Sequence, residues 1–193
     1  CEEIESMGET ALCTKGMSGV MSTAEGDDLV KGIKENSKLQ LNVHTHRTTG
    51  LGFMNYLKAV KAGANVSETA ISCLSGGTSQ PSTETLVYAL DQPGYDTGLD
   101  MAKLKKVNDF FKPLRDEVLK DGTLNPLMMA TDADALNYKI PGGMLSNLVA
   151  QLKSANKLDK LNEVLEETPR VRKDMGYPPL VTPTSQIVGS QAV

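Results

Sequence analysis

Strand and helix patterns alternate three times within the first half of the chain, and this alternation limits the possible folds more than any other feature. Strands are predicted at three apolar runs, residues 11–14, 39–46 and 65–74. Helix patterns follow them at residues 24–34, 52–61 and 81–90. Because repeated βα units form parallel sheets or barrels with right-handed crossovers, we predict an α/β first half.

The second half of the sequence has helical spacing and no strand pattern. Apolar residues recur every three or four positions from residue 101 to 118, interrupted by Pro113, which we expect to kink or split that helix. Two further helix patterns follow at residues 144–152 and 158–165. The predicted domains are residues 1–95 and the helical residues 96–193, with the boundary at Gln92-Pro93-Gly94.

The composition is that of an ordinary soluble protein and excludes several classes of function. Apolar residues make up 39% and charged residues 23% of the chain. A net charge of −4 and few aromatic residues argue against nucleic-acid binding. No stretch approaches the roughly 18 apolar residues that a membrane span needs. The three cysteines, Cys1, Cys13 and Cys73, have unrelated spacings that fit a reducing compartment, so we expect a cytoplasmic protein.

Both ends of the sequence look like interrupted elements. The chain begins with Cys1 rather than methionine, and residues 2–8 have the pattern of the end of a helix. Residues 185–188 have the pattern of the start of another helix. We therefore expect a piece of a longer polypeptide, incomplete in its C-terminal domain.

The only two histidines, His44 and His46, are two residues apart at the end of the second predicted strand. Because side chains alternate along a strand, both imidazoles project to the same side. Two neutral imidazoles on a rigid strand supply half of a coordination shell for a divalent metal. The plain alternative is a polar strand end with two solvated histidines.

Other polar residues also fall at the carboxyl ends of the predicted strands, where parallel α/β folds bind their ligands. Lys15 ends the first strand, and Thr78 lies just beyond the third. A lysine at the same edge of the sheet as a histidine pair is more typical of a binding site than of an ordinary protein surface. The plain interpretation of Thr78 is a helix N-cap, which is compatible with a second role.

Seven short motifs occur in order along the chain. They are KGMSGV at 15–20, HTHRTTG at 44–50, SGGTSQP at 75–81, GYDTGLD at 94–100, IPGGMLSN at 140–147, PRVR at 169–172 and GYPPLVTP at 176–183. Together they resemble the carboxyltransferase domain of biotin-dependent enzymes, the family of the oxaloacetate decarboxylase alpha chain, of pyruvate carboxylase in its one-chain and two-chain forms, and of the pyruvate-binding transcarboxylase subunit. The resemblance implies the last three βα units of a (β/α)8 TIM barrel, followed by an α-helical funnel domain.

The resemblance also implies roles for four residues. Lys15 matches a lysine that carbon dioxide converts to a carbamate, which then binds a divalent metal, and His44 and His46 match the two histidine ligands. Oxygen and imidazole ligands suit zinc, cobalt and manganese alike, and the metal would act as a Lewis acid near the enolate of pyruvate. Thr78 matches a threonine that relays a proton between the methyl group of pyruvate and the ureido nitrogen of biotin, a task that suits a hydroxyl.

The implied activity is carboxyl transfer between oxaloacetate or pyruvate and biotin. Biotin would sit on a separate carrier domain, since no biotinyl-lysine motif occurs in the chain. The resemblance further implies a homo-oligomer in the full-length form, and a membrane decarboxylase complex as one kind of partner. The chain by itself is expected to be inactive, because three of eight strands cannot close a barrel and the first strand would have an open edge.

Two residues depart from the family pattern, and two other functions stay open. Gly16 stands where the family usually has aspartate, and Arg47 adds a cation beside the histidine pair. Neither departure removes a ligand, but together they keep open the alternative of a non-catalytic scaffold subunit. The other alternative is an aldol-type lyase or synthase of the related metal-dependent TIM barrels, such as hydroxymethylglutaryl-CoA lyase. Lys15 and the segment 78–81 argue against it, because neither has an obvious part in aldol chemistry.

Overall fold

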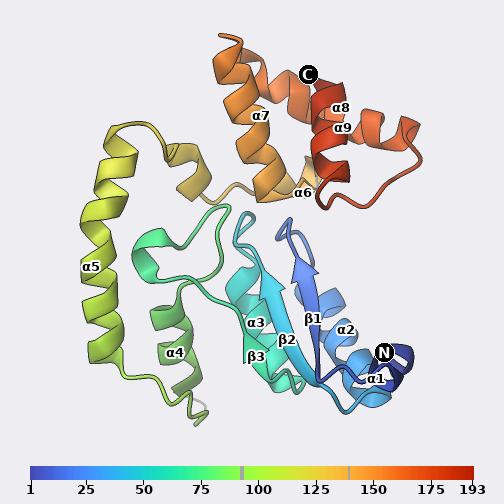
Figure 1. Ribbon diagram of the computed structural model, residues 1–193, viewed down its shortest axis with the longest axis vertical. Helices are drawn as coiled ribbons and strands as arrows, with labels where there is room; N and C mark the ends of the chain where they lie inside the picture. Colours follow the sequence, from blue (N-terminus) through green and yellow to red (C-terminus); the bar gives the residue numbers. More distant parts are fainter. Residues whose placement is uncertain (92–93, 139) are drawn as a thin grey trace.

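A small parallel sheet backed by helices forms the first half of the chain, and further helices form the second (Figure 1). The computed structural model describes residues 1–91, 94–138 and 140–193. Within them, a three-stranded parallel sheet has the order β1 (Ala11–Gly16), β2 (Gln40–Thr45), β3 (Val66–Ser67). The helices that follow the strands in turn are α2 (Thr23–Asn36), α3 (Gly52–Lys61) and α4 (Thr83–Asp91). The predicted α/β architecture with a parallel sheet is therefore confirmed.

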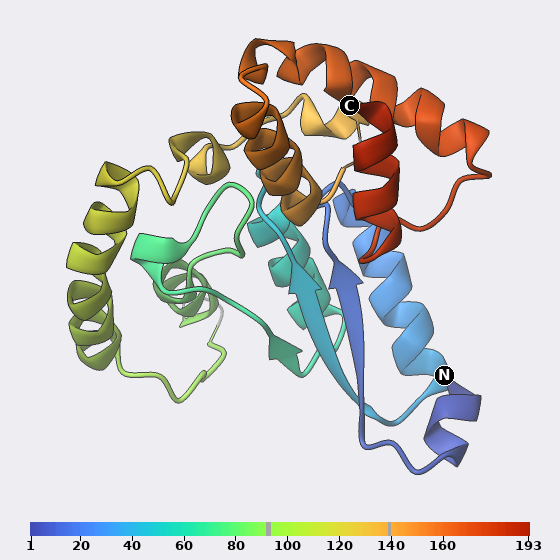
Figure 2. The same ribbon diagram turned by 45° about the horizontal axis from the view of Figure 1, so that its top comes forward.

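The two faces of the sheet have different surroundings. Helices α2 and α3 cover one face in both ribbon views (Figures 1 and 2). Leu41 and Val43 of β2 point into this layer and are only 0% and 5% exposed. Because side chains alternate along a strand, Asn42 and His44 point to the opposite face. Apolar burial on one side thus fixes the direction of the polar residues on the other.

Helix α2 begins where its sequence supplies a complete N-terminal cap. The hydroxyl of Ser22 accepts from the backbone N–H of Glu25 at 3.2 Å, and the Glu25 carboxylate accepts from the backbone N–H of Ser22 at 2.8 Å. This reciprocal capping satisfies two backbone donors at the start of the helix. The turn between β1 and α2 is thereby anchored next to the carboxyl end of β1.

The third strand is much shorter than we predicted, because residues 65–74 leave the sheet after Ser67. The backbone of Ala70 pairs with the segment before α4 instead of with β2. The N–H of Ala70 donates to the carbonyl of Pro81 at 3.0 Å, and the N–H of Thr83 donates to the carbonyl of Ala70 at 2.8 Å. Residues further on form the 3₁₀ helix η1 (Ser72–Leu74), in which Cys73 is buried. The apolar run therefore marks a packed loop, not a long strand.

The remaining elements are helical, as predicted. They are α1 (Glu2–Ser6), α5 (Met101–Lys120), the 3₁₀ helix η2 (Pro126–Met129), α6 (Ala135–Tyr138), α7 (Gly142–Ser154), the 3₁₀ helix η3 (Leu158–Lys160), α8 (Leu161–Asp174) and α9 (Thr184–Ala192). Pro113 does not split α5, which continues through it. None of the residues of α5, all of which the structure describes, is buried, so water can solvate the carbonyl that Pro113 leaves without a donor.

Helices α7, α8 and α9 pack on one another above the carboxyl ends of β1 and β2 (Figures 1 and 2). Their shared core consists of Ile140, Met144, Leu148, Leu152, Val164, Leu165, Val171, Val188 and Ala192. Of the predicted domain boundary, Gln92 and Pro93 lie outside the described residues. Within the described part of the chain, no helix has the length and apolar character needed to cross a membrane.

Candidate functional site

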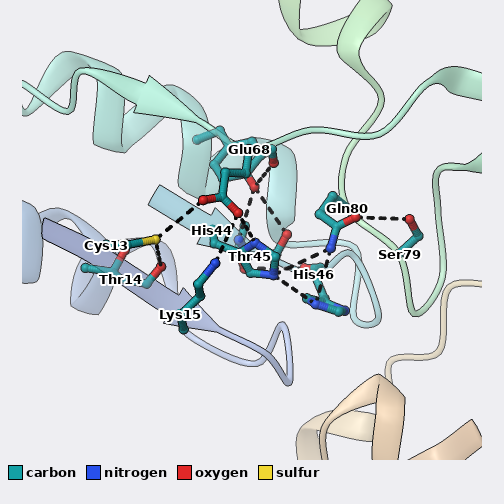
Figure 3. A network of polar contacts seen from close by, with 10 residues as sticks. Cys13, Thr14, Lys15, His44, Thr45, His46, Glu68, Ser79 and Gln80 are labelled. Carbon is teal, nitrogen blue, oxygen red and sulfur yellow. Dashed lines mark hydrogen bonds and ion pairs between the residues drawn. The ribbon is translucent and has the colours of Figure 1, made fainter. Parts of the chain in front are cut away.

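Lys15, His44 and His46 lie together at the carboxyl ends of β1 and β2 (Figure 3). Lys15 of β1 is paired in register with His44 of β2, so their side chains lie on the same face of the sheet. His46 follows β2 directly, and the backbone N–H of His46 donates to the carbonyl of Gly16 at 3.1 Å. Thr78 lies in the loop between η1 and α4.

Glu68, the first residue after β3, joins Lys15 to His44. One of its carboxylate oxygens, Oε2, lies 2.6 Å from Nδ1 of His44 and 3.2 Å from Nζ of Lys15. The hydrogen bond with His44, followed by the one with Lys15, holds the pKa of Glu68 below its usual value. The hydrogen bond with Glu68 raises the pKa of Lys15. The Glu68 carboxylate is therefore ionised, and it carries the hydrogen bonds of both side chains.

The ring of His46 is fixed by a backbone group. Its Nδ1 is within hydrogen-bond distance of the carbonyl oxygen of Thr78. Because a carbonyl can only accept, Nδ1 of His46 carries the hydrogen. His46 is 8% exposed, and burial lowers its pKa, so the ring is neutral near pH 7.

The two imidazoles point their remaining nitrogens at each other. Nε2 of His44 and Nε2 of His46 are 3.1 Å apart. Nδ1 of His46 donates to a carbonyl, so Nε2 of His46 presents a lone pair, while Nδ1 of His44 faces the Glu68 carboxylate. Histidines oriented by oxygen acceptors at their other nitrogen are the usual ligands of divalent metals, and a cation between the two Nε2 atoms would be bound by both rings. The donor set therefore fits a metal ion bound between the two rings.

Gln80 lies beside both imidazole rings. Its Nε2 is 3.5 Å from Nε2 of His44 and 3.4 Å from Nε2 of His46. Among the described residues, no group of three or more His, Cys, Asp or Glu side chains is arranged to hold a metal ion. A complete ligand shell would therefore need Lys15 or a group beyond these residues.

Tyr56 of α3 supports the site from the buried face of the sheet. Its side chain is 1% exposed, and its hydroxyl accepts from the backbone N–H of Thr45 at 3.1 Å and donates to the carbonyl of Glu68. Burial raises the pKa of Tyr56 to about 12. One phenol thus joins the end of β2 to the backbone of the residue that binds Lys15 and His44.

The two departures from the family pattern have definite places in the structure. The guanidinium of Arg47 lies over the ring of Phe53 on α3, 5.7 Å from its centroid. A Cβ atom at Gly16 would lie 3.1 Å from the carbonyl oxygen of His44, so a larger side chain there would crowd the backbone of β2. Neither residue removes a candidate ligand.

Sequence reasoning missed two members of this cluster, Glu68 and Gln80. Glu68 could have been found by the rule that identified Lys15, because it also lies at the carboxyl end of a strand. The overestimated length of the third strand concealed this position. Gln80 lies inside the SGGTSQP motif, but nothing in the sequence indicates that its amide faces two imidazoles.

Comparison with known proteins gives a consistent result along the whole chain. The HMGL-like family model matches residues 1–111, and the model of a conserved carboxylase domain matches residues 135–193. A pyruvate carboxylase subunit of Methanocaldococcus jannaschii is 51% identical over 192 residues, which is 100% of this chain and 34% of that protein. The methylmalonyl-CoA carboxyltransferase 5S subunit of Propionibacterium freudenreichii is 41% identical over 97% of this chain and 37% of its own length.

A solved structure agrees with the sequence relatives. The carboxyl transferase domain of Rhizobium etli pyruvate carboxylase with pyruvate has a TM-score of 0.88 and 28% identity, over 99% of this chain and 32% of that one. The chain thus spans about a third of the length of the proteins that it matches. It belongs to the HMGL-like family, among the members related to the carboxyltransferase domains of pyruvate carboxylases.

Proposed function

We propose that this chain contributes the C-terminal part of a carboxyltransferase that moves a carboxyl group between the oxaloacetate/pyruvate pair and biotin on a separate carrier domain. Relatives named for such activities match nearly its whole length. The observation that carries the proposal is the pair of Nε2 atoms of His44 and His46, 3.1 Å apart, whose rings are held by Glu68, which also binds Lys15, and by the carbonyl of Thr78.

The proposed architecture divides the chain into two domains. Residues 1–95 would be the last three βα units of a (β/α)8 TIM barrel, and residues 96–193 a helical carboxylase domain. The parallel strands in chain order support this arrangement, since barrel strands follow one another in this way. The free edge of β1 would then pair with a preceding strand.

Lys15, His44 and His46 would hold the divalent metal, which is zinc, cobalt or manganese, with Lys15 carbamylated by carbon dioxide. Nζ of Lys15 lies 3.2 Å from a carboxylate oxygen of Glu68. Carbamylation would replace the positive charge of Lys15 by a negative charge next to this carboxylate. Two negative charges so close repel each other unless a cation lies beside them. Carbamylation and metal binding therefore favour each other. When bound, the metal supplies a Lewis acid for the negative charge that develops on the keto oxygen of the substrate.

Thr78 is the proposed proton-transfer residue, and it would also contact biotin. Its hydroxyl donates to the carbonyl of Met128 at 3.2 Å. Oγ1 would accept a proton from the methyl group of pyruvate as the hydroxyl gives its own hydrogen to the ureido nitrogen of biotin, so the residue is neutral before and after the transfer. Because His46 binds the carbonyl of Thr78, the hydroxyl stays at a fixed distance from the proposed metal ligands.

A second candidate function is the aldol-type lyase or synthase, which the HMGL-like match and the histidine pair favour. It would use His44 and His46 in the same way but would need neither biotin nor a carbamate on Lys15. The dependence of the reaction on biotin separates the two candidates.

Three further features belong to the proposal. We place the protein in the cytoplasm, because Cys1, Cys13 and Cys73 are free thiols, as a reducing compartment would keep them. We also expect a homo-oligomer in the full-length form, with a membrane decarboxylase complex as one possible assembly. We do not expect the protein to bind nucleic acid, because its net charge is −4.

The test measures metal content and biotin-dependent decarboxylation of oxaloacetate by the full-length protein. We expect about one divalent metal ion per chain, lost in H44Q and in H46Q. K15R keeps the positive charge and its attraction to Glu68 but cannot be carbamylated, so it should lose both metal and activity. K38R, at an exposed position before β2, is the matched control and should keep both.

The outcomes separate the hypotheses. Metal-dependent cleavage of a substrate without biotin would identify the aldol-type enzyme. Absence of stoichiometric metal from the wild type would identify a non-catalytic scaffold. Normal metal affinity of K15R, with no dependence on bicarbonate, would exclude the carbamate.

A further inference from the structure

Thr78 is held from three sides by groups that come from distant parts of the chain. Its carbonyl binds the ring of His46 at the end of β2. Its backbone N–H and its hydroxyl both donate to the carbonyl of Met128, at 2.9 Å and 3.2 Å. Its third neighbour is Gly142, the first residue of α7. Two of the three supports thus belong to the helical half.

Gly142 approaches Thr78 more closely than any other residue type could. A Cβ atom built on Gly142 would lie 2.6 Å from Cβ and 3.0 Å from the carbonyl oxygen of Thr78. A Cβ atom built on the adjacent Gly143 would have no described heavy atom within 4 Å. The two glycines occupy the same helical turn, but Gly142 is buried against Thr78 and Gly143 is exposed. The Pro-Gly-Gly sequence therefore contains one position that must be glycine and one that need not be.

Helix α7 also controls the position of Met128. The hydroxyl of Ser146, one turn after Gly142, lies 3.1 Å from the sulfur of Met128 and 3.0 Å from the carbonyl oxygen of Gly142. Met128 is 8% exposed, so its backbone has little freedom to move. The first turn of α7 therefore fixes Thr78 directly through Gly142 and indirectly through Met128.

We propose that Gly142 and the carbonyl of Met128 are positioning groups that hold the hydroxyl of Thr78 for proton transfer. This inference rests on the proposed role of Thr78. The carbonyl accepts the hydroxyl hydrogen and thereby directs the Oγ1 lone pairs away from Met128. Gly142 lets the start of α7 contact the backbone and Cβ of Thr78, and this contact fixes how closely Thr78 lies to the helix. A shift of about 1 Å at a reacting group can cost about 100-fold in rate.

The experiment compares G142A with G143A in the full-length protein. Both variants gain the same methyl group in the same helical turn, so their effects on helix propensity are matched. We expect kcat of G142A, measured at saturating metal, to fall about 100-fold, with the KM for oxaloacetate close to wild type. G143A should keep kcat, KM and melting temperature. Equal kcat values for the two variants would overturn the inference.

Two further variants separate this inference from the proposed function. If T78A keeps wild-type kcat, the role of Thr78 is wrong, and the inference fails with it. If T78A loses activity, the double variant T78A/G142A should be no slower than T78A, because Gly142 acts through the hydroxyl. An additional loss in the double variant would mean that Gly142 acts elsewhere and would overturn the inference alone.

A variant without added volume covers the case in which G142A does not fold. S146A removes the hydroxyl that contacts Met128, and we expect kcat to fall about fivefold, the equivalent of one ordinary hydrogen bond. In the T78A background, S146A should have no further effect on kcat. Wild-type kcat for S146A, or an equal loss in both backgrounds, would overturn the proposed positioning by α7.

Discussion

Lys15 and His44 are direct partners across the parallel β1–β2 pair, and their side chains end on the same carboxylate oxygen of Glu68. The relationship follows from strand register alone, because paired residues of neighbouring strands share a face. It makes Glu68 the residue that sets the charge and the direction of both side chains.

The first prediction concerns E68Q. The amide keeps the size of the side chain but loses the charge that orients His44 and Lys15. Removing such an outer partner of a metal-binding histidine typically costs 10- to 100-fold in metal affinity, and we expect a loss in this range. Competition with a chelator measures it. The exposed carboxylate of Glu9 provides the control E9Q, and equal affinities of the two variants would contradict the role of Glu68.

The second prediction concerns Y56F. The substitution keeps the buried ring but leaves the backbone N–H of Thr45 and the carbonyl of Glu68 without the hydroxyl that binds them. An unsatisfied buried polar group costs about 1–3 kcal/mol, so the free energy of unfolding should fall by an amount in that range. Urea denaturation checks the value. Tyr88 is 65% exposed, and Y88F should leave the stability unchanged.

The third prediction is the pH dependence that Tyr56 produces. Its pKa is raised to about 12 in the folded chain, against about 10 in an unfolded one. The corresponding stabilisation is fully present below about pH 10 and is lost as the pH rises toward about 12, because only the unfolded state releases the proton there. The loss amounts to about 2.5 kcal/mol. Denaturation between these pH values should show this slope, and Y56F should lack it.

The fourth prediction concerns Gly19, which has φ +65° and whose added Cβ would lie 2.6 Å from the carbonyl oxygen of His46. G19A should therefore lose about 2–3 kcal/mol of stability and displace His46. Gly63 has φ +102°, but an added Cβ would meet only Lys34 Cγ at 3.7 Å. G63A should thus lose only the backbone part, about 1 kcal/mol. Thermal melts of both variants measure the difference.

The rim of polar residues could be predicted because it depends on local patterns. Alternation along β2 places Leu41 and Val43 on the buried face, which leaves His44 on the other. The end of β1 at Lys15 and Gly16 follows from the same kind of pattern. Strand direction in a parallel sheet then brings Lys15 and His44 to one edge.

The contacts of Glu68 and Met128 could not be predicted, because they depend on how segments far apart in the sequence pack against each other. Glu68 lies beside His44 because the β2–β3 register, which pairs Asn42 with Val66 and Val43 with Ser67, continues for one more residue, and the N–H of Glu68 still donates to the carbonyl of Val43 at 3.0 Å. Met128 meets Thr78 across a separation of 50 residues, through a loop that has no periodic pattern. Local spacing carries no information about either contact.

The carbonyl and the hydroxyl of Thr78 belong to one residue, so the position of one cannot be changed without moving the other. Its carbonyl orients an imidazole, while its hydroxyl lies only a few bonds away in the same residue. Any redesign that turns the 75–81 loop would also move the carbonyl that orients the ring of His46. Substitutions meant to alter the proposed substrate preference would therefore have to leave the backbone of Thr78 in place.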